Sequence, residues 1–345
     1  MFKRYLTAIA AALSLTGVGA AQAADISGAG ATFPAPVYAK WAETYRAQTN
    51  NRLNYQAIGS GGGVRQITAG TVDFGATDKP LKPDDLASGG FAMFPTVIGG
   101  VVPVVNLPGI KSGQVKLTGA LTADIFRGVV KKWNDPLIAK YNPGVTLPNL
   151  PITVVHRSDG SGTTFLFTSY LAMKAPRWAS EVGANDAVKW PTGLGGKGND
   201  GVAAYVKQTP GAIGYVEYAF AKQNGLTYAL LQNKAGKYVA PAAANFQAAA
   251  ANANWKAAPG FYLLLLDQPG AEAWPITGAT FILVKTKQED AAKGREVLAF
   301  FDWAYKNGDA AAAQLDYLPM PASVKDMVRK SWAKVTGPDG KPVYR

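Results

Sequence analysis

His156-Arg157-Ser158-Asp159-Gly160-Ser161-Gly162-Thr163-Thr164-Phe165 is the stretch around which the chain is organised. An apolar, β-branched run at residues 152–155 precedes it, and a helix-compatible apolar stretch runs from Phe165 to Met173. This order predicts a strand, a tight glycine-containing turn and a helix that starts near Ser161. Strands and helices alternate in the same way along the rest of the chain, which predicts the α/β fold class.

The predicted helix start could hold an anion. Backbone N–H groups in the first turn of a helix have no helical partner and carry partial positive charge. The hydroxyls of Ser161 and Thr163 would add donors, and Gly162 would let an oxyanion come close because it has no side chain. Arg157 would supply more donors, and Asp159 can pair with it and cancel its charge. A plain capping motif with a surface ion pair explains the same residues, and Ser-Gly-Thr alone is more often that.

The composition narrows the possible functions. The chain has no cysteine and one histidine, His156, which argues against disulfides, thiol nucleophiles, zinc sites and most hydrolytic triads. A net charge of +12 would suit nucleic acid, an anionic membrane surface or an anionic solute. The basic residues are scattered, without a dense Lys/Arg run, so we expect no nucleic-acid partner.

Residues 1–23 have the pattern of a secretory signal peptide. Lys3 and Arg4 precede an apolar run from Leu6 to Val18, and small residues surround the expected cleavage site after Ala23. Cleavage there would lower the net charge to +10, because Lys3 and Arg4 are the only charged residues removed. A membrane anchor is the alternative, but the apolar run is too short to span a bilayer comfortably. Without cysteine the chain cannot carry a lipid on an N-terminal Cys, so we expect a periplasmic protein.

Two other segments combine small residues with a predicted helix start. Val37, Trp41 and Tyr45 recur at helical spacing, which places Thr32 and Phe33 just before a helix N-terminus. A strand-like run at 53–58 meets Gly59-Ser60-Gly61-Gly62-Gly63, where a second helix is expected to begin. That loop is not a P-loop, because no Gly-Lys-Ser/Thr follows it. Each segment could also be a simple loop with a capping residue.

Two further segments carry possible ligand-binding groups. Residues 72–77 predict a short strand that ends on Asp78, and open α/β sheets place ligand groups at such ends, although a lone Asp is more often a cap. Within residues 190–201, three glycines fit the dinucleotide fingerprint G-x-G-x-x-G. Pro191 stands where the apolar strand should precede that fingerprint, so we expect a loop there, followed by a helix over 202–207.

Two apolar runs interrupted by proline and glycine, at 91–105 and 274–284, are candidate crossovers between two domains. The first run predicts consecutive buried strands. Helices are expected over 241–253, 297–305 and 324–335.

These segments together closely resemble the phosphate-binding family of type II periplasmic solute-binding proteins, which serve phosphate ABC transporters. The resemblance covers essentially the whole mature chain and rests on the joint order of Gly28–Pro36, Gly59-Ser60, Val72–Asp78, Arg157–Thr163, Leu194–Gly201 and Gly214–Glu217. It implies the type II periplasmic binding protein fold, with two α/β lobes, two crossover strands and the ligand in the cleft. The implied lobes are residues 24–98 with 275–345, and residues 99–274.

The resemblance also implies a set of ligand-binding residues. The positions that match the family's phosphate site are Thr32, Phe33, Ser60, Asp78, Arg157, Ser161, Gly162 and Thr163, supported by Ala31 and Asp159. Relatives often have a second serine where this chain has Gly61, and His156 is expected to be structural. Phosphate at neutral pH keeps a proton that Asp78 could accept, whereas sulfate has none, so Asp78 is expected to favour phosphate.

The function implied by the resemblance is to bind inorganic phosphate in the periplasm and deliver it to the permease and ATPase subunits of an ABC importer. No cofactor, metal or catalytic residue is expected, and the chain is expected to be a monomer. One alternative is a receptor for arsenate, sulfate or molybdate. Another is a secreted serine hydrolase that uses Ser161 or Ser60. Against the hydrolase, the chain has no G-x-S-x-G elbow and its only histidine lies beside Arg157.

Overall fold

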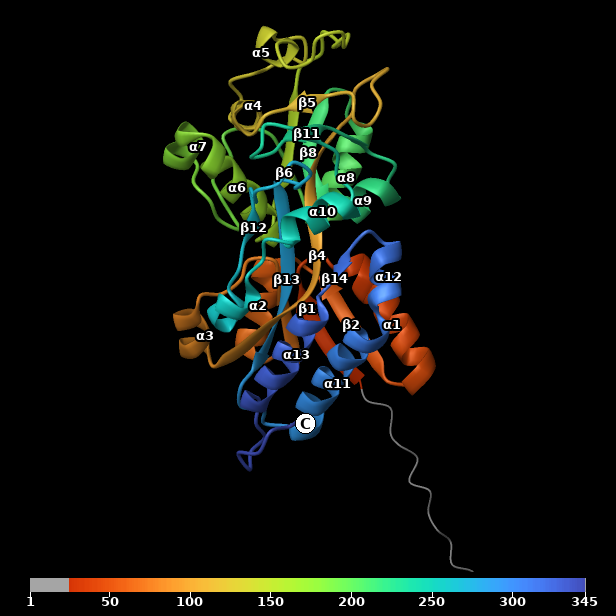
Figure 1. The fold of residues 1–345 in the computed structure, drawn as a ribbon, viewed down its shortest axis with the longest axis vertical. Helices are drawn as coiled ribbons and strands as arrows, with labels where there is room; N and C mark the ends of the chain where they lie inside the picture. Colours follow the sequence, from red (N-terminus) through yellow and green to blue (C-terminus); the bar gives the residue numbers. More distant parts are fainter. Residues whose placement is uncertain (1–24, 345) are drawn as a thin grey trace, which may run out of the picture.

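The computed structural model describes residues 25–344, so the predicted signal peptide and its cleavage site lie outside the described residues. One mixed sheet runs through the molecule in the strand order β2-β1-β3-β13-β4-β8-β6-β7, with helices packed around it (Figure 1). The strands of this path are β1 (Asp25–Gly30), β2 (Arg52–Ala57), β3 (Phe74–Thr77), β4 (Phe91–Val105), β6 (Thr153–Arg157), β7 (Leu194–Gly196), β8 (Ala212–Glu217) and β13 (Ile276–Lys285). The predicted α/β class is confirmed.

Short strands and helices complete the described chain. The short strands are β5 (Lys116–Leu117), β9 (Thr227–Tyr228), β10 (Leu230–Gln232), β11 (Tyr238–Val239), β12 (Leu265–Leu266) and β14 (Leu318–Pro319). The α-helices are α1 (Ala35–Thr49), α2 (Ser60–Ala69), α3 (Pro83–Gly89), α4 (Gly119–Phe126), α5 (Pro136–Ala139), α6 (Gly162–Lys174), α7 (Pro176–Glu181), α8 (Gly198–Gln208), α9 (Tyr218–Gln223), α10 (Ala243–Ala250), α11 (Ala291–Asn307), α12 (Asp309–Gln314) and α13 (Ala322–Ser331). Single 3₁₀ turns lie at Trp255–Ala257, Pro259–Phe261 and Trp332–Lys334. The helices predicted over 241–253, 297–305 and 324–335 correspond to α10, α11 and α13 with shifted ends.

Strands β4 and β13 run along the long axis of the molecule (Figure 1). They pair antiparallel to each other between β3 on one side and β8 on the other. Strands β1 and β2 with helices α1 and α2 lie towards one end, and β6 and β8 with α6 and α8 lie towards the other (Figure 1). Strands β4 and β13 are therefore suited to be the two expected crossover strands. The lobe boundaries at 98/99 and 274/275 stay a prediction.

The expectation of consecutive strands over 91–105 is wrong, because these residues form the single strand β4. The pairing with β13 shifts register between Thr280, which pairs with Val97, and Phe281, which pairs with Pro95, so Thr96 is the extra residue. Proline cannot donate to a ladder, and a bulge is a place where a sheet tolerates it. At this bulge the hydroxyl of Thr96 donates to the carbonyl of Thr280 at 3.2 Å. The irregularity therefore bends the pairing without ending the strand.

The expectation of a loop over 190–201 is also wrong in part. Residues Leu194–Gly196 form β7, which pairs parallel with β6, and α8 begins at Gly198 rather than near residue 202. Gly198 has φ +69°, a left-handed conformation that glycine adopts without strain. The earlier start places the first turn of α8 beside the end of β6.

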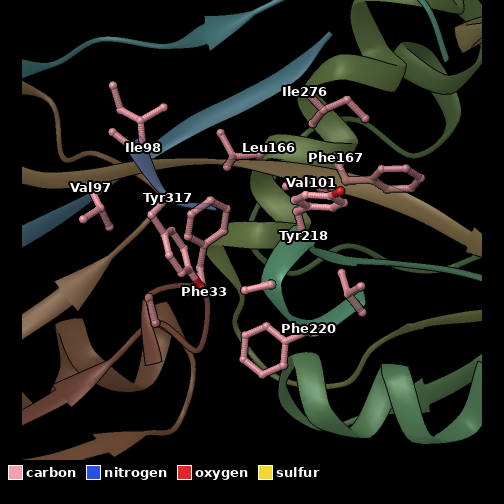
Figure 2. Close-up of a cluster of buried hydrophobic side chains, with 14 of the residues drawn as sticks. Phe33, Val97, Ile98, Val101, Leu166, Phe167, Tyr218, Phe220, Ile276 and Tyr317 are labelled. Atoms are coloured by element: carbon pink, nitrogen blue, oxygen red, sulfur yellow. Dashed lines mark hydrogen bonds between the residues drawn. The ribbon is translucent and has the colours of Figure 1, made fainter. Parts of the chain in front are cut away.

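The core is apolar on both faces of the central strands, as in sheets covered by helices on both sides. Figure 2 shows its middle part, in which side chains from the N-terminal, central and C-terminal segments meet. There Phe33 lies beside Tyr317, with ring centroids 6.2 Å apart. Between residues 25 and 344, no helix is both long and apolar enough to cross a membrane.

Candidate anion-binding site

The predicted site residues come together from several helix starts and strand ends. Ser60 opens α2, Asp78 follows β3, and the segment from Arg157 to Thr163 joins β6 to α6. The buried side chains among the predicted site residues are those of Thr32, Phe33, Ser60, Asp78, Arg157, Ser161 and Thr163, while Asp159 is partly buried. A Cβ added at Gly162 would lie 2.6 Å from Ser60 Oγ and 2.5 Å from Asp78 Cβ. Only glycine fits at this position, because the first turn of α6 lies directly against α2 and the end of β3.

The four hydroxyls of the site share one property, which is that each accepts hydrogen bonds from protein N–H groups. Ser60 Oγ accepts from the backbone of Gly162 at 3.0 Å and of Asp78 at 3.2 Å. Ser161 Oγ accepts from Thr164 N at 3.0 Å. Thr32 and Thr163 accept from Asn199, as described below. In residues 25–344 the hydroxyls of Thr32, Ser161 and Thr163 donate to no protein acceptor, so each has a proton available for an anion. The hydroxyl of Ser60 lies beside the carboxyl of Asp78.

The sequence left open whether Ser161, Ser60 and Thr32 only cap helices, and the structure shows a capping bond for Ser161 alone among these three. Ser161 is the N-cap of α6, but the cap bond uses a lone pair of its oxygen and leaves its proton free. Ser60 makes no cap bond, because the N-cap position of α2 is Gly59. Thr32 is not a cap either, since Pro34 occupies the N-cap position of α1.

Backbone donors add to the hydroxyls. The N–H groups of Thr32, Phe33, Ser60 and Thr163 have no protein acceptor in the part of the chain that the structure describes. The N–H of Gly162 differs from the prediction, because it donates to Ser60 Oγ. Ala31 presents no free donor, since its N–H bonds to the carbonyl of Ala76 at 2.9 Å. Unpaired N–H groups at helix starts are suited to an anion.

Arg157 is held by Asp159, as the sequence predicts. Its Nε and Nη2 donate to the two carboxylate oxygens at 2.7 and 2.5 Å, and its Nη1 lies 3.4 Å from Thr163 Oγ1. Burial alone would raise the pKa of Asp159, but the hydrogen bonds and positive charge of Arg157 outweigh it and hold that pKa below its ordinary value. Asp159 stays ionised, so the pair is close to neutral and Arg157 acts mainly through its geometry.

Asp78 is the acidic member of the site. Its Oδ1 accepts from Thr280 Oγ1 at 2.6 Å, while its buried Oδ2 has no hydrogen-bond partner in residues 25–344. Burial raises the pKa of Asp78 to about 7, partly opposed by the bond from Thr280 and the charge of Arg157. A buried carboxylate oxygen without a partner is costly, so Oδ2 is suited to meet a proton on a ligand.

The environment of His156 suits the structural role expected for it. Its ring stacks on Trp190 with centroids 4.7 Å apart, and Nδ1 lies 2.9 Å from the carbonyl of Arg157. Burial lowers the pKa of His156, which disfavours a charged imidazole. No hydrogen bond joins it to a serine among the described residues, so the arrangement lacks the base that a serine nucleophile needs.

Sequence reasoning missed three residues that hold the site. Thr280 on β13 binds Asp78, and Asn199 on α8 binds Thr32 and Thr163. Tyr215 on β8 accepts from Arg157 N at 3.2 Å, and its hydroxyl lies 2.6 Å from Thr164 Oγ1. The only signal for Asn199 was its place in the motif Leu194–Gly201, and a strand threonine or tyrosine has no local signature.

The chain is similar to known proteins over most of its length. Residues 17–307 match the family model described as a PBP superfamily domain. The chain is 54% identical to the phosphate-binding protein PstS of Pasteurella multocida, over 94% of each chain. This chain belongs to the phosphate-binding protein family. Within that family it is also 53% identical to PstS of Haemophilus influenzae (90% and 93% covered) and 38% identical to PstS of Methanocaldococcus jannaschii (81% and 78% covered).

Solved structures of phosphate-binding proteins share the fold. A human phosphate binding apolipoprotein matches with a TM-score of 0.73 at 22% identity, over 93% of this chain and all of the other. A phosphate binding protein from Stenotrophomonas maltophilia matches with a TM-score of 0.65 at 19% identity, over 89% and 94%. These similarities confirm the predicted fold class, the type II periplasmic binding protein fold.

Proposed function

We propose that this chain binds inorganic phosphate and passes it to the membrane subunits of an ABC importer. The observation that carries the proposal is the combination of several free donors with an unpaired buried carboxylate oxygen at the same site, Asp78 Oδ2. Phosphate that keeps one proton matches this set, because its bare oxygens accept from the donors while its single O–H donates to Asp78. A dehydrated anion is tolerated where its lone pairs find donors.

The proposed ligand-binding residues are those that the sequence indicated. The hydroxyls of Thr32, Ser60, Ser161 and Thr163, the backbone of Phe33 and the guanidinium of Arg157 would donate, and Asp78 would accept. Gly162 would serve by its lack of a side chain, which lets the anion come close to the first turn of α6, because its own N–H donates to Ser60 Oγ. Asp159 supports the site by pairing with Arg157. Ala31 supports it through the backbone, because its bond to Ala76 anchors the chain beside Thr32.

We further propose that residues 24–98 with 275–345 and residues 99–274 are two lobes that close over the ligand. Several contacts join these two sets in the structure. Gly61 N donates to the carbonyl of Gly160 at 2.9 Å, and Lys79 pairs with Asp186 at 2.7 Å. Asn199 donates to Thr32 across the same boundary. A cavity of about 600 Å³ lies next to Ser60 between the two sets, with Lys79 and Asp186 in its lining. A closed form with bound phosphate would keep these contacts.

A periplasmic location, with cleavage after Ala23, follows from the signal-peptide pattern of residues 1–23. We place the chain among solute receptors rather than enzymes, because the histidine that a serine nucleophile would use, His156, stacks on Trp190 and makes no hydrogen bond to Ser60 or Ser161 in residues 25–344. Delivery to permease and ATPase subunits is the role that the family resemblance implies for a periplasmic receptor. A turnover assay on phosphate and acyl esters should give no rate above background.

Calorimetric titration of the purified mature chain with phosphate, sulfate and arsenate tests the proposal. At pH 8 we expect tight binding of phosphate and far weaker binding of sulfate, which has no proton for Asp78. Arsenate shares the proton of phosphate, so it should bind as well. Equal affinity for sulfate and phosphate, or no phosphate binding, would contradict the proposal.

A further inference from the structure

Asn199 is a buried side chain that contacts hydroxyls from both proposed lobes. It is fully buried in the first turn of α8, where Gly198 N donates to Asp159 Oδ1 at 3.0 Å. Its Nδ2 donates to Thr32 Oγ1 at 2.8 Å and lies 3.4 Å from Thr163 Oγ1. Its backbone N–H also donates to Thr32 Oγ1, at 3.2 Å. One amide thus reaches two of the proposed phosphate ligands from opposite sides of the cleft.

The orientation of the Asn199 amide is fixed by a third contact. Its Oδ1 accepts from the backbone N–H of Glu217 at 3.0 Å. A backbone N–H can only donate, so the oxygen of the amide must face Glu217 and the NH₂ must face the threonines. The side chain cannot turn over without losing these bonds, and it is packed on all sides.

This orientation decides what the threonine hydroxyls can do. Thr32 Oγ1 accepts from both N–H groups of Asn199, and Thr163 Oγ1 accepts from Asn199 and from Arg157. A hydroxyl can accept two hydrogen bonds through its lone pairs and donate one through its proton. Both lone pairs of each threonine oxygen are already used, so only the proton can form a hydrogen bond with a ligand. Neither hydroxyl can then accept a proton from a ligand. Ser60 and Ser161 are oriented by backbone N–H groups instead, so only the Thr32–Thr163 pair depends on a side chain.

We propose that Asn199 is a specificity-determining residue that forces Thr32 and Thr163 to act as donors, so that the oxygens facing them must carry no proton. The inference rests on the proposed function and deepens it. The ligand's proton is confined to the Asp78 side of the site, and a phosphate with a second proton finds no acceptor for it. Asn199 acts through the two hydroxyls and does not itself need to touch the anion.

A double-mutant cycle in phosphate affinity tests this role. Asn199→Ala leaves the hydroxyls free to turn, and we expect about tenfold weaker phosphate binding at pH 8. In a Thr163→Val or Thr32→Val background the same change should have a clearly smaller effect, because the hydroxyl through which it acts is gone. The matched control is a Ser161→Ala background, because the hydroxyl of Ser161 does not contact Asn199. There Asn199→Ala should weaken phosphate binding by the same factor as in the parent.

Asn199→Asp is the second variant and keeps the volume of the side chain, so the test continues if Asn199→Ala does not fold. Its carboxylate would accept the threonine protons and turn them away from the anion, so binding at pH 8 should be weaker than in Asn199→Ala. The inference would be overturned if Asn199→Ala weakened phosphate binding by the same factor in the Thr32→Val and Thr163→Val backgrounds as in the parent. It would also be overturned if Asn199→Asp bound phosphate as tightly as the parent. Neither result would contradict the proposed function. A parent chain that does not bind phosphate would overturn the proposed function and this inference together.

Discussion

Thr280 donates a 2.6 Å hydrogen bond to one oxygen of Asp78, and the other oxygen of this carboxylate is buried without a partner in residues 25–344. The two residues come from β13 and from the end of β3, which are neighbours in the sheet. The bond fixes the rotation of the carboxylate and so directs Oδ2 away from Thr280. Discrimination between anions can therefore depend on one fixed oxygen rather than on a mobile side chain.

Asp78→Asn should reduce the preference for phosphate over sulfate. The amide keeps the shape and removes the negative charge, so sulfate no longer meets a like charge. Phosphate loses at most part of its affinity, because the amide can still donate to it. Sites that bind a ligand O–H can reject analogues that lack it by about 10⁴–10⁵-fold, so the expected fall in the ratio is large. The measurement is the phosphate-to-sulfate affinity ratio at one pH and salt, and an unchanged ratio would remove Asp78 as the cause.

Sulfate affinity of the parent should rise as the pH falls. Burial raises the pKa of Asp78 to about 7, so the carboxyl carries its own proton below that pH and can donate it to sulfate. Between pH 8 and pH 6 the protonated fraction rises about tenfold, and sulfate affinity should follow it. Titrations in one salt across this range measure the effect, with Asp78→Asn as the control that should stay flat. A parent with the same flat profile would count against a titrating Asp78.

Ser161→Ala should weaken phosphate binding by about 1–3 kcal/mol, because one lone pair of the buried anion loses its donor. It should also lower the free energy of unfolding by about 1 kcal/mol, since Ser161 caps α6. Thr118→Ala is a matched control, because Thr118 caps α4 with a similar 3.1 Å bond to Leu121 N. It should cost similar stability and leave phosphate affinity unchanged. Equal affinity in both variants would mean that Ser161 only caps the helix.

Gly162→Ala should prevent full closure of the lobes. The new Cβ would overlap Ser60 Oγ and Asp78 Cβ, and overpacking of this kind costs about 1–3 kcal/mol. Phosphate affinity should fall by about 5–150-fold, while the ligand-free chain should unfold at nearly the parent temperature, because an open cleft has room for the methyl group. Small-angle scattering should show compaction on adding phosphate to the parent and less in the variant. Absence of compaction in the parent would contradict the two-lobe proposal.

Glu217→Gln should stabilise the chain at alkaline pH. Burial raises the pKa of Glu217 from 4.5 to about 8, partly opposed by a hydrogen bond from Tyr317. The folded state therefore holds this proton more tightly than the unfolded state. The stability that it contributes is fully present below about pH 4.5 and is lost as the pH rises towards 8, at about 1.4 kcal/mol per pH unit. Urea unfolding at pH 5, 7 and 9 measures the free energy of unfolding, which should rise in Glu217→Gln relative to the parent as the pH rises. Parallel curves would exclude a buried proton on Glu217.

The sequence predicts the fold class, which is confirmed, and a set of candidate site residues, because each of these residues lies in a short local motif at a strand end or helix start. It does not predict the residues that orient them. Asn199 and Thr32 are 167 residues apart, and Thr280 and Asp78 are 202 apart, so only the folded sheet brings each pair together. The division of 91–105 into strands was wrong for a related reason. Pro95 indicates a break locally, yet pairing with β13 accommodates it through a bulge.

The position of β13 in the sheet has a consequence for the order in which the chain can fold. Strands β1 to β4 are complete by residue 105, but residues 276–285 must insert between β3 and β4 before that half of the sheet can close. A nascent chain that has emerged only as far as α10 would have two unpaired strand edges in its N-terminal half. Such long-range pairing is slow to form. Strands β3 and β4 therefore cannot reach their final pairing before residues 276–285 are made, which keeps this part of the sheet incomplete until late in synthesis.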